Sequence, residues 1–327
     1  MTSQEIERRI VGRTPLGDHV GKSGATLERV RLDDGRSLVL KRLTPRDDLV
    51  MAVTRDRVGR EFVLWRSGVL DRLPGGVGHA VVDGWVEKDG AVLVLRDLGD
   101  AVLTWDDRVD TRRCQWMLER LARLHTAFLD QPLEPGAATP PEELVALFAP
   151  RLMVPHGVGG NPLVAASMRG WELFPGLVPG DVADAVLGLL EHPRPLVTAL
   201  RNRPCTLVHG DLATVNMAVE DDTLVLIDWG LCAHLPGAMD VARFVAGCSS
   251  VVEPSREEVL QGYAEAAGPA YDEAAMRLSL LAALVWLGWN KALDAVEHPD
   301  PEKRERERED LAWWVREAQT TLAAGLL

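Results

Sequence analysis

The strongest constraint on this chain is a polar stretch placed between two short apolar runs. The stretch reads His209-Gly-Asp-Leu-Ala-Thr-Val-Asn216 and follows the short, mostly apolar run Thr206-Leu-Val208. A second apolar run, residues 224–227, comes next and ends directly at Asp228-Trp-Gly230. Short β-branched runs of this kind predict buried strands, and a polar residue at the end of such a strand is held rigidly at the rim of a cleft. We therefore expect the polar residues of the two stretches to meet.

The residue types in these stretches suit phosphoryl transfer to a hydroxyl group. That reaction needs a carboxylate to orient the hydroxyl and accept its proton, and it needs hard oxygen ligands for Mg²⁺. Either motif alone would be compatible with an ordinary turn. The two motifs in this order, with a strand between them, are far more specific.

The same residues resemble the catalytic core of the aminoglycoside phosphotransferase family, small-molecule relatives of the eukaryotic-type protein kinases. His209-Gly-Asp211-Leu with Asn216 has the spacing of the kinase pattern His-Arg-Asp-x-x-x-x-Asn, and Asp228-Trp-Gly230 stands where kinases carry Asp-Phe-Gly. The resemblance implies that Asp211 is the catalytic base and that Asn216 and Asp228 bind Mg²⁺. It also implies an α+β, bilobal, protein-kinase-like fold with a small β-rich N-lobe and a larger, mostly helical C-lobe.

The first hundred residues predict a β-rich lobe. Residues 27–32 and 37–43 read as a hairpin, because two β-type runs flank a turn containing Asp-Gly. Lys41 lies in the second run, and alternation alone would let it face solvent. The resemblance implies instead that Lys41 contacts the α and β phosphates of the nucleotide. A helix is expected over residues 56–70, where Glu61 resembles the ion-pair partner of that lysine; the alternative for Glu61 is a solvated helix face.

A glycine-rich segment precedes the hairpin and invites comparison with a P-loop. The pattern Gly-x-x-x-x-Gly-Lys-[Ser/Thr] would need a glycine at position 16, which is Leu16. A flexible hairpin over the phosphates of a kinase N-lobe fits better, with Gly21, Ser23 and Gly24 as backbone donors.

Another strand pair is expected over residues 77–86 and 91–97. It runs into Arg96-Asp97-Leu98, and the resemblance implies that the backbone of this linker reads the adenine edge. We expect the boundary between the lobes near residue 100, with the N-lobe at 1–99 and the C-lobe at 100–327.

Beyond residue 100 the chain turns helical. An apolar stripe over residues 117–128 predicts a buried helix face, on which His125 is expected to pack in the core. Thr139-Pro-Pro-Glu142 has the pattern of a capping box and predicts a helix start. Residues 155–179 are rich in Gly and Pro, and their aromatic residues Trp171 and Phe174 could cover the acceptor or join the core. Residues 255–327 are helical by composition.

The segment after the second motif favours a small acceptor. Only nine residues separate Gly230 from Asp240, which leaves little room for the long activation segment with which protein kinases bind peptides. Asp240-Val-Ala resembles the family's Asp-Leu-Ala motif, whose aspartate braces the catalytic loop through backbone hydrogen bonds. The expected role of Asp240 is therefore structural.

Charge and cysteine content limit the partners and the compartment. The net charge of −13 argues against nucleic acid and anionic membrane surfaces as partners and leaves room for a cationic acceptor. Four cysteines without a Cys-x-x-Cys pair predict free thiols in a reducing compartment. The N-terminus lacks the apolar core of a signal peptide, and no apolar run reaches membrane-spanning length. These features predict a soluble, cytoplasmic protein. The acidic side chains expected to rim an acceptor site are Glu253, Glu257, Glu258, Asp294, Glu297 and Asp300.

These observations predict a kinase that moves the γ-phosphate of ATP or GTP, with Mg²⁺, onto a hydroxyl of a small acceptor such as an aminoglycoside or amino sugar. A neutral sugar or an amino alcohol is the alternative acceptor. A nucleotide-binding pseudokinase that regulates a partner is disfavoured because the candidate catalytic residues are all present, and a P-loop NTPase is disfavoured by the broken spacing. The acceptor's identity, the choice of nucleotide and the oligomeric state stay open.

Overall fold

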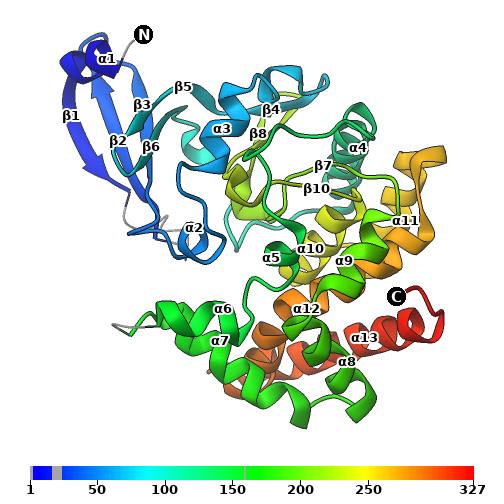
Figure 1. Ribbon diagram of the computed structural model, residues 1–327. Coiled ribbons are helices and arrows are strands. Elements are labelled where there is room, and N and C mark those ends of the chain that lie inside the picture. The colour runs from blue at the N-terminus through cyan, green and yellow to red at the C-terminus, as the bar shows by residue number, and fades with distance from the viewer. Residues whose placement is uncertain (1–2, 17–23, 158–159) are drawn as a thin grey trace.

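The computed structural model describes residues 3–16, 24–157 and 160–327, and these form a small β-rich lobe and a larger helical lobe (Figure 1). The small lobe contains a five-stranded antiparallel sheet with the order β1-β2-β3-β6-β5. Its strands are β1 (Ile10–Pro15), β2 (Thr26–Leu32), β3 (Ser37–Leu43), β5 (Val81–Glu87) and β6 (Gly90–Arg96). The bilobal α+β prediction is confirmed, and so is the hairpin of β2 with β3.

The two faces of this sheet have different neighbours. Val30, Leu38 and Leu40 pack with Ile6 of helix α1 (Ser3–Arg9) in a small apolar cluster on one face. Lys41 follows Leu40 and therefore points to the opposite face, because successive strand side chains alternate. There it is buried rather than solvated, since side chains from α3 and from the larger lobe cover it.

The helical part of the small lobe is shorter than the sequence suggests. Within the helix expected over residues 56–70, only α3 (Arg60–Arg66) is α-helical; the short helix α2 (Leu49–Val53) lies before that range, and the 3₁₀ turn η1 (Leu70–Arg72) begins at its end. The Asp56 carboxylate accepts hydrogen bonds from the backbone N–H groups of Gly59 and Arg60 at 2.8 and 2.7 Å. Gly59 has φ +103°, so the chain cannot continue as a helix through that residue.

The run expected as one strand over residues 77–86 is two strands. β4 (Val77–His79) is not part of the five-stranded sheet. It pairs in parallel with β9 (Thr223–Leu226), whereas β5 pairs with β6. With β8 (Met217–Glu220) these strands form the three-stranded sheet β4-β9-β8. A separate pair joins β7 (Thr206–Val208) and β10 (Ala233–Leu235). The strands predicted at residues 206–208 and 224–227 are confirmed.

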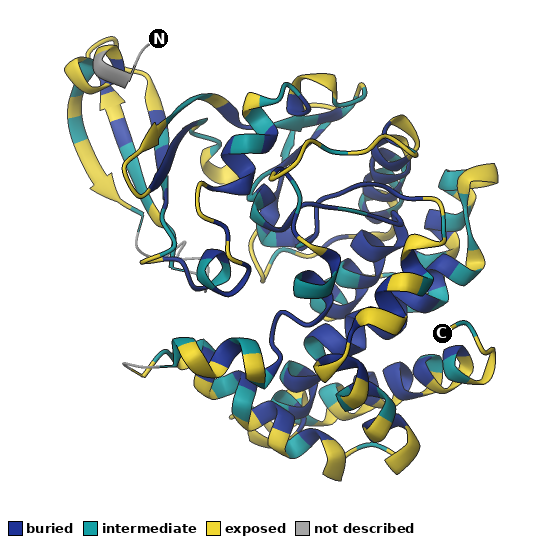
Figure 2. Ribbon diagram, viewed as in Figure 1, coloured by how far each residue is buried: buried dark blue, intermediate teal, exposed yellow. Residues whose placement is uncertain are grey.

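The larger lobe is built around α12, which packs against α7, α10 and α13. Figure 2 shows buried residues concentrated where these helices and the central strands meet. Its α-helices are α4 (Thr111–Ala127), α5 (Pro141–Val145), α6 (Pro150–Met153), α7 (Pro162–Leu173), α8 (Gly180–Glu191), α9 (Arg194–Arg201), α10 (Ala238–Cys248), α11 (Arg256–Ala267), α12 (Glu273–Glu297) and α13 (Pro301–Ala323). Its 3₁₀ turns are η2 (Gly99–Ala101), η3 (Val154–His156), η4 (Phe174–Gly176), η5 (Thr214–Asn216), η6 (Trp229–Leu231) and η7 (Gly268–Ala270).

Side-chain caps explain where several of these helices begin. Asp110 caps α4, Asn161 caps α7, Asp272 caps α12 and Asp300 caps α13, each by accepting a backbone N–H of the first turn. Ser255 and Glu258 form a complete capping box at α11.

Three expectations for the larger lobe have clear outcomes. The stripe in α4 is buried, and His125 on it is 5% exposed, as predicted. The helix start predicted near Thr139 is confirmed, since α5 begins at Pro141, but the capping box is wrong: α5 has no side-chain cap, and the buried Thr139 hydroxyl has no hydrogen-bond partner among the described residues. Trp171 and Phe174 belong to the core, since both are buried and the Trp171 indole N–H donates to the Phe148 carbonyl.

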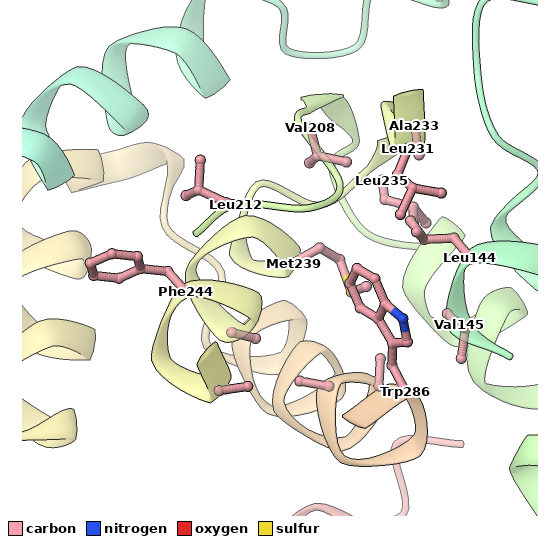
Figure 3. Packing of buried hydrophobic residues seen from close by; sticks show 14 of the residues in the cluster. Leu144, Val145, Val208, Leu212, Leu231, Ala233, Leu235, Met239, Phe244 and Trp286 are labelled. Carbon is pink, nitrogen blue, oxygen red and sulfur yellow. The ribbon is translucent and has the colours of Figure 1, made fainter. Parts of the chain in front are cut away.

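The apolar core fixes α10 beneath the central strands. Figure 3 shows Met239 of α10 beside Trp286 of α12, with Leu144 and Val145 of α5 on the other side of the indole. Phe244, one turn further along α10, belongs to the same cluster. This packing sets the position of every polar side chain that α10 carries toward the strands.

Two further predictions concern cysteines and membrane spans. All four cysteines are buried and free, as expected. Within the described ranges, no helix has both the length and the apolar character that crossing a membrane requires.

Candidate active site

The catalytic-loop motif lies between β7 and η5 and is held from below by Asp240. This aspartate is fully buried and accepts backbone N–H groups of His209 and Gly210, both at 2.8 Å. Its carboxylate also lies 3.2 Å from His125 Nε2, and His125 Nδ1 lies 2.8 Å from the Tyr263 hydroxyl. The predicted bracing role of Asp240 is confirmed, and His125 takes part in it as a buried hydrogen-bonding residue.

Gly210 is required by the shape of this loop. Its φ is +85°, and a Cβ atom at this position would lie 2.0 Å from the Leu231 carbonyl oxygen. The close approach brings the loop against the turn that follows Asp228. Only glycine meets both the conformational and the steric demand.

His209 joins the two motifs. Its Nδ1 accepts the Asp211 N–H at 3.3 Å, and its Nε2 donates to the Ile227 carbonyl at 2.9 Å. These backbone partners make Nε2 the donor and Nδ1 the acceptor of the ring. The imidazole also lies against the buried ring of Trp229, with 4.7 Å between ring centroids.

Asp211, in the catalytic-loop motif, has a side chain that is 32% exposed. Asn216 holds the loop around it, because Asn216 Nδ2 donates to the Asp211 carbonyl at 2.8 Å. Arg243 of α10 forms an ion pair with the same aspartate, its Nε and Nη2 both lying 2.8 Å from Oδ1. Sequence reasoning did not identify Arg243. The available signal was its position three residues after Asp240, which places both on one face of a helix.

Two ion pairs share the Lys41 ammonium, one with Glu61 and one with Asp228. Lys41 Nζ lies 2.6 Å from Glu61 Oε2 and 2.7 Å from Asp228 Oδ1. Burial lowers the pKa of Lys41, but the carboxylates of Asp228 and Glu61 outweigh it, so this pKa is raised. Burial likewise raises the pKa of Asp228, but the Lys41 ammonium outweighs it and lowers the pKa below its ordinary value. Both shifts favour the charged forms of Lys41 and Asp228.

Asp228 has an unusual backbone. Its φ and ψ are 65° and 61°, in the left-handed region, at the junction between β9 and η6. Non-glycine residues adopt this region rarely, and such residues cluster at functional sites. The conformation leaves the Asp228 side chain 44% exposed, whereas Lys41 and Glu61 beside it are buried.

Asn216 and Asp228 offer oxygen atoms that suit Mg²⁺. The Ile227 N–H donates to the Asn216 carbonyl at 3.0 Å, which places the residue next in sequence, Asp228, beside Asn216. Asn216 uses its Nδ2 for the bond to Asp211, so its Oδ1 is available, and Lys41 engages only Oδ1 of Asp228. Mg²⁺ is typically held by one or two carboxylates together with substrate phosphates. The donor set therefore fits this ion.

The residues expected to contact the nucleotide are only partly described. Gly21 and Ser23 lie outside the described residues. Gly24 has φ +103°, and a Cβ atom there would lie 2.2 Å from the Asp47 carbonyl oxygen. The glycine therefore lets two backbone segments approach closely.

The side chains of the linker between the lobes, residues 96–98, contact other parts of the protein. The Arg96 guanidinium pairs with Glu220 at 2.7 Å, and the Asp97 carboxylate pairs with Arg29 of β2 at 2.7 Å. Leu98 packs against an apolar cluster that contains Ala218 of β8. Because both charged side chains have partners in the protein, a contact from this linker to a nucleotide would come from its backbone.

The acidic residues expected to rim an acceptor site have local partners. Glu258 and Asp300 cap helices, and Glu253 accepts the Thr111 N–H at the start of α4. The remaining three bond to neighbouring helical side chains, namely Glu257 to Trp313, Asp294 to Asn290 and Glu297 to Arg169. These contacts give the six residues roles in helix capping and helix packing.

Comparisons with known proteins agree with this geometry. Residues 23–278 match the model of the phosphotransferase enzyme family. The structure is similar to an aminoglycoside phosphotransferase from Alicyclobacillus acidocaldarius, with 15% identity and a TM-score of 0.52 over 99% of this chain and 95% of that one. A choline kinase from Streptococcus pneumoniae shows 13% identity and a TM-score of 0.56, with 96% of each chain covered. A spectinomycin phosphotransferase in complex with ADP and spectinomycin shows 13% identity and a TM-score of 0.53, over 100% of this chain and 99% of that one. A comparison with the curated proteins finds no match.

Proposed function

Because the chain belongs to the phosphotransferase enzyme family and is a kinase of small-molecule hydroxyl groups, we propose that Asp211 is its catalytic base and that Mg²⁺ with ATP or GTP is its phosphate donor. One observation carries this assignment: a continuous series of short contacts runs from the small lobe to Asp211. Lys41 bonds to Asp228 at 2.7 Å, the neighbouring Ile227 N–H bonds to Asn216 at 3.0 Å, and Asn216 bonds to Asp211 at 2.8 Å. These contacts bring together residues remote in sequence, which supports the assignment because phosphoryl transfer depends on positioning a base, a metal ion and the phosphates.

In the proposed reaction, the acceptor hydroxyl donates a hydrogen bond to the Asp211 carboxylate. Its oxygen attacks the γ-phosphorus, a new O–P bond forms, and the bond to the β,γ-bridging oxygen breaks, so that a nucleoside diphosphate leaves. The hydroxyl proton ends on Asp211. Lys41, held by Glu61, positions the phosphates.

Asn216 and Asp228 would hold Mg²⁺ through the oxygens that their protein contacts leave available. When bound, the ion neutralises negative charge on the phosphates. The backbone of Arg96, Asp97 and Leu98 would contact the base, and Gly24 would lie over the phosphates.

We propose an amine-bearing acceptor, with a neutral sugar as the alternative. Two facts support an amine. Three similar structures with a TM-score above 0.5 are an aminoglycoside phosphotransferase, a choline kinase and a spectinomycin phosphotransferase, and the chain carries a net charge of −13, which attracts cations. The four free, buried cysteines suit a reducing compartment such as the cytoplasm, and the same negative charge disfavours nucleic acid as a partner.

A phosphate-transfer panel tests this proposal. Streptomycin, spectinomycin, choline, ethanolamine, glucosamine and glucose would each be incubated with Mg·ATP or Mg·GTP, and products would be identified by mass and by ³¹P NMR. We expect an amine-bearing acceptor to be phosphorylated. The KM for that acceptor should rise with ionic strength, because the Debye length falls from about 10 Å at 0.1 M salt to about 3 Å at 1 M. A best acceptor that is uncharged, with a KM independent of salt, would show that the amine assignment is wrong.

The variant Asp211→Asn tests the base assignment and separates a kinase from a pseudokinase. Removing a general base costs about 10² to 10⁴ in rate, so kcat should fall by that factor while nucleotide affinity stays the same. Full activity in this variant would refute the role of Asp211. Nucleotide binding without turnover of any acceptor in the wild-type protein would favour the pseudokinase.

A further inference from the structure

Arg243 occupies the side of Asp211 that faces α10. Its side chain is 11% exposed, whereas the Asp211 side chain is 32% exposed. Two of its nitrogens, Nε and Nη2, converge on one carboxylate oxygen, Oδ1, each at 2.8 Å. Charge-assisted bonds of this length are strong and directional, so they restrict the rotation of the carboxylate.

The two oxygens of Asp211 are therefore not equivalent. Oδ1 accepts both nitrogens of Arg243, whereas the contact found for Oδ2 among the described residues is a long one of 3.4 Å to Asn216 Nδ2. Asn216 Nδ2 has its shorter bond, 2.8 Å, to the Asp211 carbonyl. Oδ2 is thus the oxygen with lone pairs available for an acceptor hydroxyl.

The guanidinium is held in place from three directions. Asp240, one turn earlier on α10, is anchored to the catalytic loop, which fixes the helix relative to Asp211. The ring of Trp286 lies under the guanidinium, with 5.5 Å from Cζ to the ring centroid. Gly247, one turn later, leaves room for it, since a Cβ atom there would lie 2.2 Å from Arg243 Nη1.

A further sign of function is an unmet hydrogen-bonding requirement. Nη1 of Arg243 is buried and has no hydrogen-bond partner among the described residues. A buried N–H group without a partner lowers stability, so packing alone does not explain an arginine here. Its bonds to Asp211 do.

We propose that Arg243 is a positioning residue for phosphoryl transfer: it engages Asp211 Oδ1 so that Oδ2 faces the acceptor hydroxyl and accepts its proton. This inference rests on the proposed role of Asp211 as the base. The hydroxyl proton moves to Oδ2 as the O–P bond forms, and Arg243 keeps its own protons throughout.

Three variants test the proposal with Mg·ATP and the panel acceptor that gives the highest kcat/KM. Arg243→Gln removes the ion pair and should lower kcat by about 10²-fold, the usual effect of displacing a reacting group by about 1 Å, with KM for ATP unchanged. Arg243→Lys should recover part of this loss, because an ammonium restores the charge but cannot reproduce the two-nitrogen fork. Gly247→Ala should also lower kcat by displacing Nη1, although alanine favours a helix more than glycine does.

Arg120→Gln is the matched control. Arg120 of α4 is also buried, pairs with Asp222 at 2.7 Å and lies 4.2 Å from the ring centroid of Trp116. Arg120 thus combines an ion pair with a ring contact, as Arg243 does, but it does so at the turn between β8 and β9, the end of that hairpin remote from Asn216. We expect Arg120→Gln to change thermal stability and leave kcat unchanged.

A crystal structure of Arg243→Gln provides a readout that needs no acceptor. We expect the Asp211 carboxylate to rotate away from its wild-type orientation. An unchanged carboxylate, or a kcat that falls no further than in Arg120→Gln, would overturn the positioning role. If Asp211→Asn retains full activity, the proposed base is wrong; if Asp211→Asn is inactive while Arg243→Gln is fully active, only the role of Arg243 is wrong.

Discussion

Lys41 and Glu61 form a buried pair whose two single substitutions should differ in cost. Lys41→Met leaves the Glu61 carboxylate, 1% exposed, without its ion-pair partner. Breaking a buried pair in this way costs about 3–5 kcal/mol of the free energy of unfolding. Glu61→Gln keeps a hydrogen-bond acceptor near Lys41, and Lys41 retains Asp228 at 2.7 Å, so we expect a loss of only about 1–2 kcal/mol.

The double variant Lys41→Met/Glu61→Leu separates stability from function. Replacing a buried pair by apolar side chains is often neutral, so the double variant should be more stable than Lys41→Met, with a coupling of about 2–3 kcal/mol. It should nevertheless fail to turn over ATP, because no ammonium remains to hold the phosphates. Urea unfolding followed by circular dichroism measures the first effect, and the acceptor panel measures the second. A cost for Lys41→Met no larger than that for Glu61→Gln, or additive costs in the double variant, would refute this reasoning.

Three further predictions concern the metal, the loop and a half-buried histidine. Asp228→Ala should abolish the Mg²⁺-dependent rise in thermal stability caused by ATP, whereas Asp240→Ala should retain that rise on a less stable protein; a wild-type response in the first variant would contradict the metal role. Gly210→Ala should cost about 3 kcal/mol or more in urea unfolding, because of its φ of +85° and the Leu231 carbonyl 2.0 Å from the new Cβ; a cost near zero would mean that the loop relaxes freely. Burial lowers the pKa of His79, assisted by Arg96 and opposed by Asp71, so the unfolded chain binds the proton more tightly and stability falls as pH drops below the ordinary value of 6.5. His79→Gln should reduce that slope in unfolding measured between pH 7.5 and 5.5, and an unchanged slope would assign it to other groups.

Local patterns in the sequence were sufficient for the order and type of the main elements. The five-residue interval between Asp211 and Asn216 lies within one loop, so their contact depends on local geometry that the spacing already implies. The apolar stripe of α4 and the hairpin of β2 with β3 follow from helical and strand periodicity, which act over a few residues. The bracing role of Asp240 followed from a family resemblance in the same short region.

Contacts between elements remote in sequence depended on tertiary packing. Alternation along β3 predicts that the side chains of Lys41 and Leu40 lie on opposite faces of the sheet. Only the tertiary structure shows that α3 and the β9–η6 junction cover the face that carries Lys41. The sequence of β4, Val77-Gly-His79, does not specify which sheet it joins, and its parallel pairing with β9 is decided by how the lobes meet. From the sequence alone, Arg243 is one charged residue among many on a helix. Its contact with Asp211 depends on the position of α10 beneath the catalytic loop. A side chain's neighbours along a helix or strand are set by backbone periodicity, whereas its neighbours across the fold are set by the packing of the whole core.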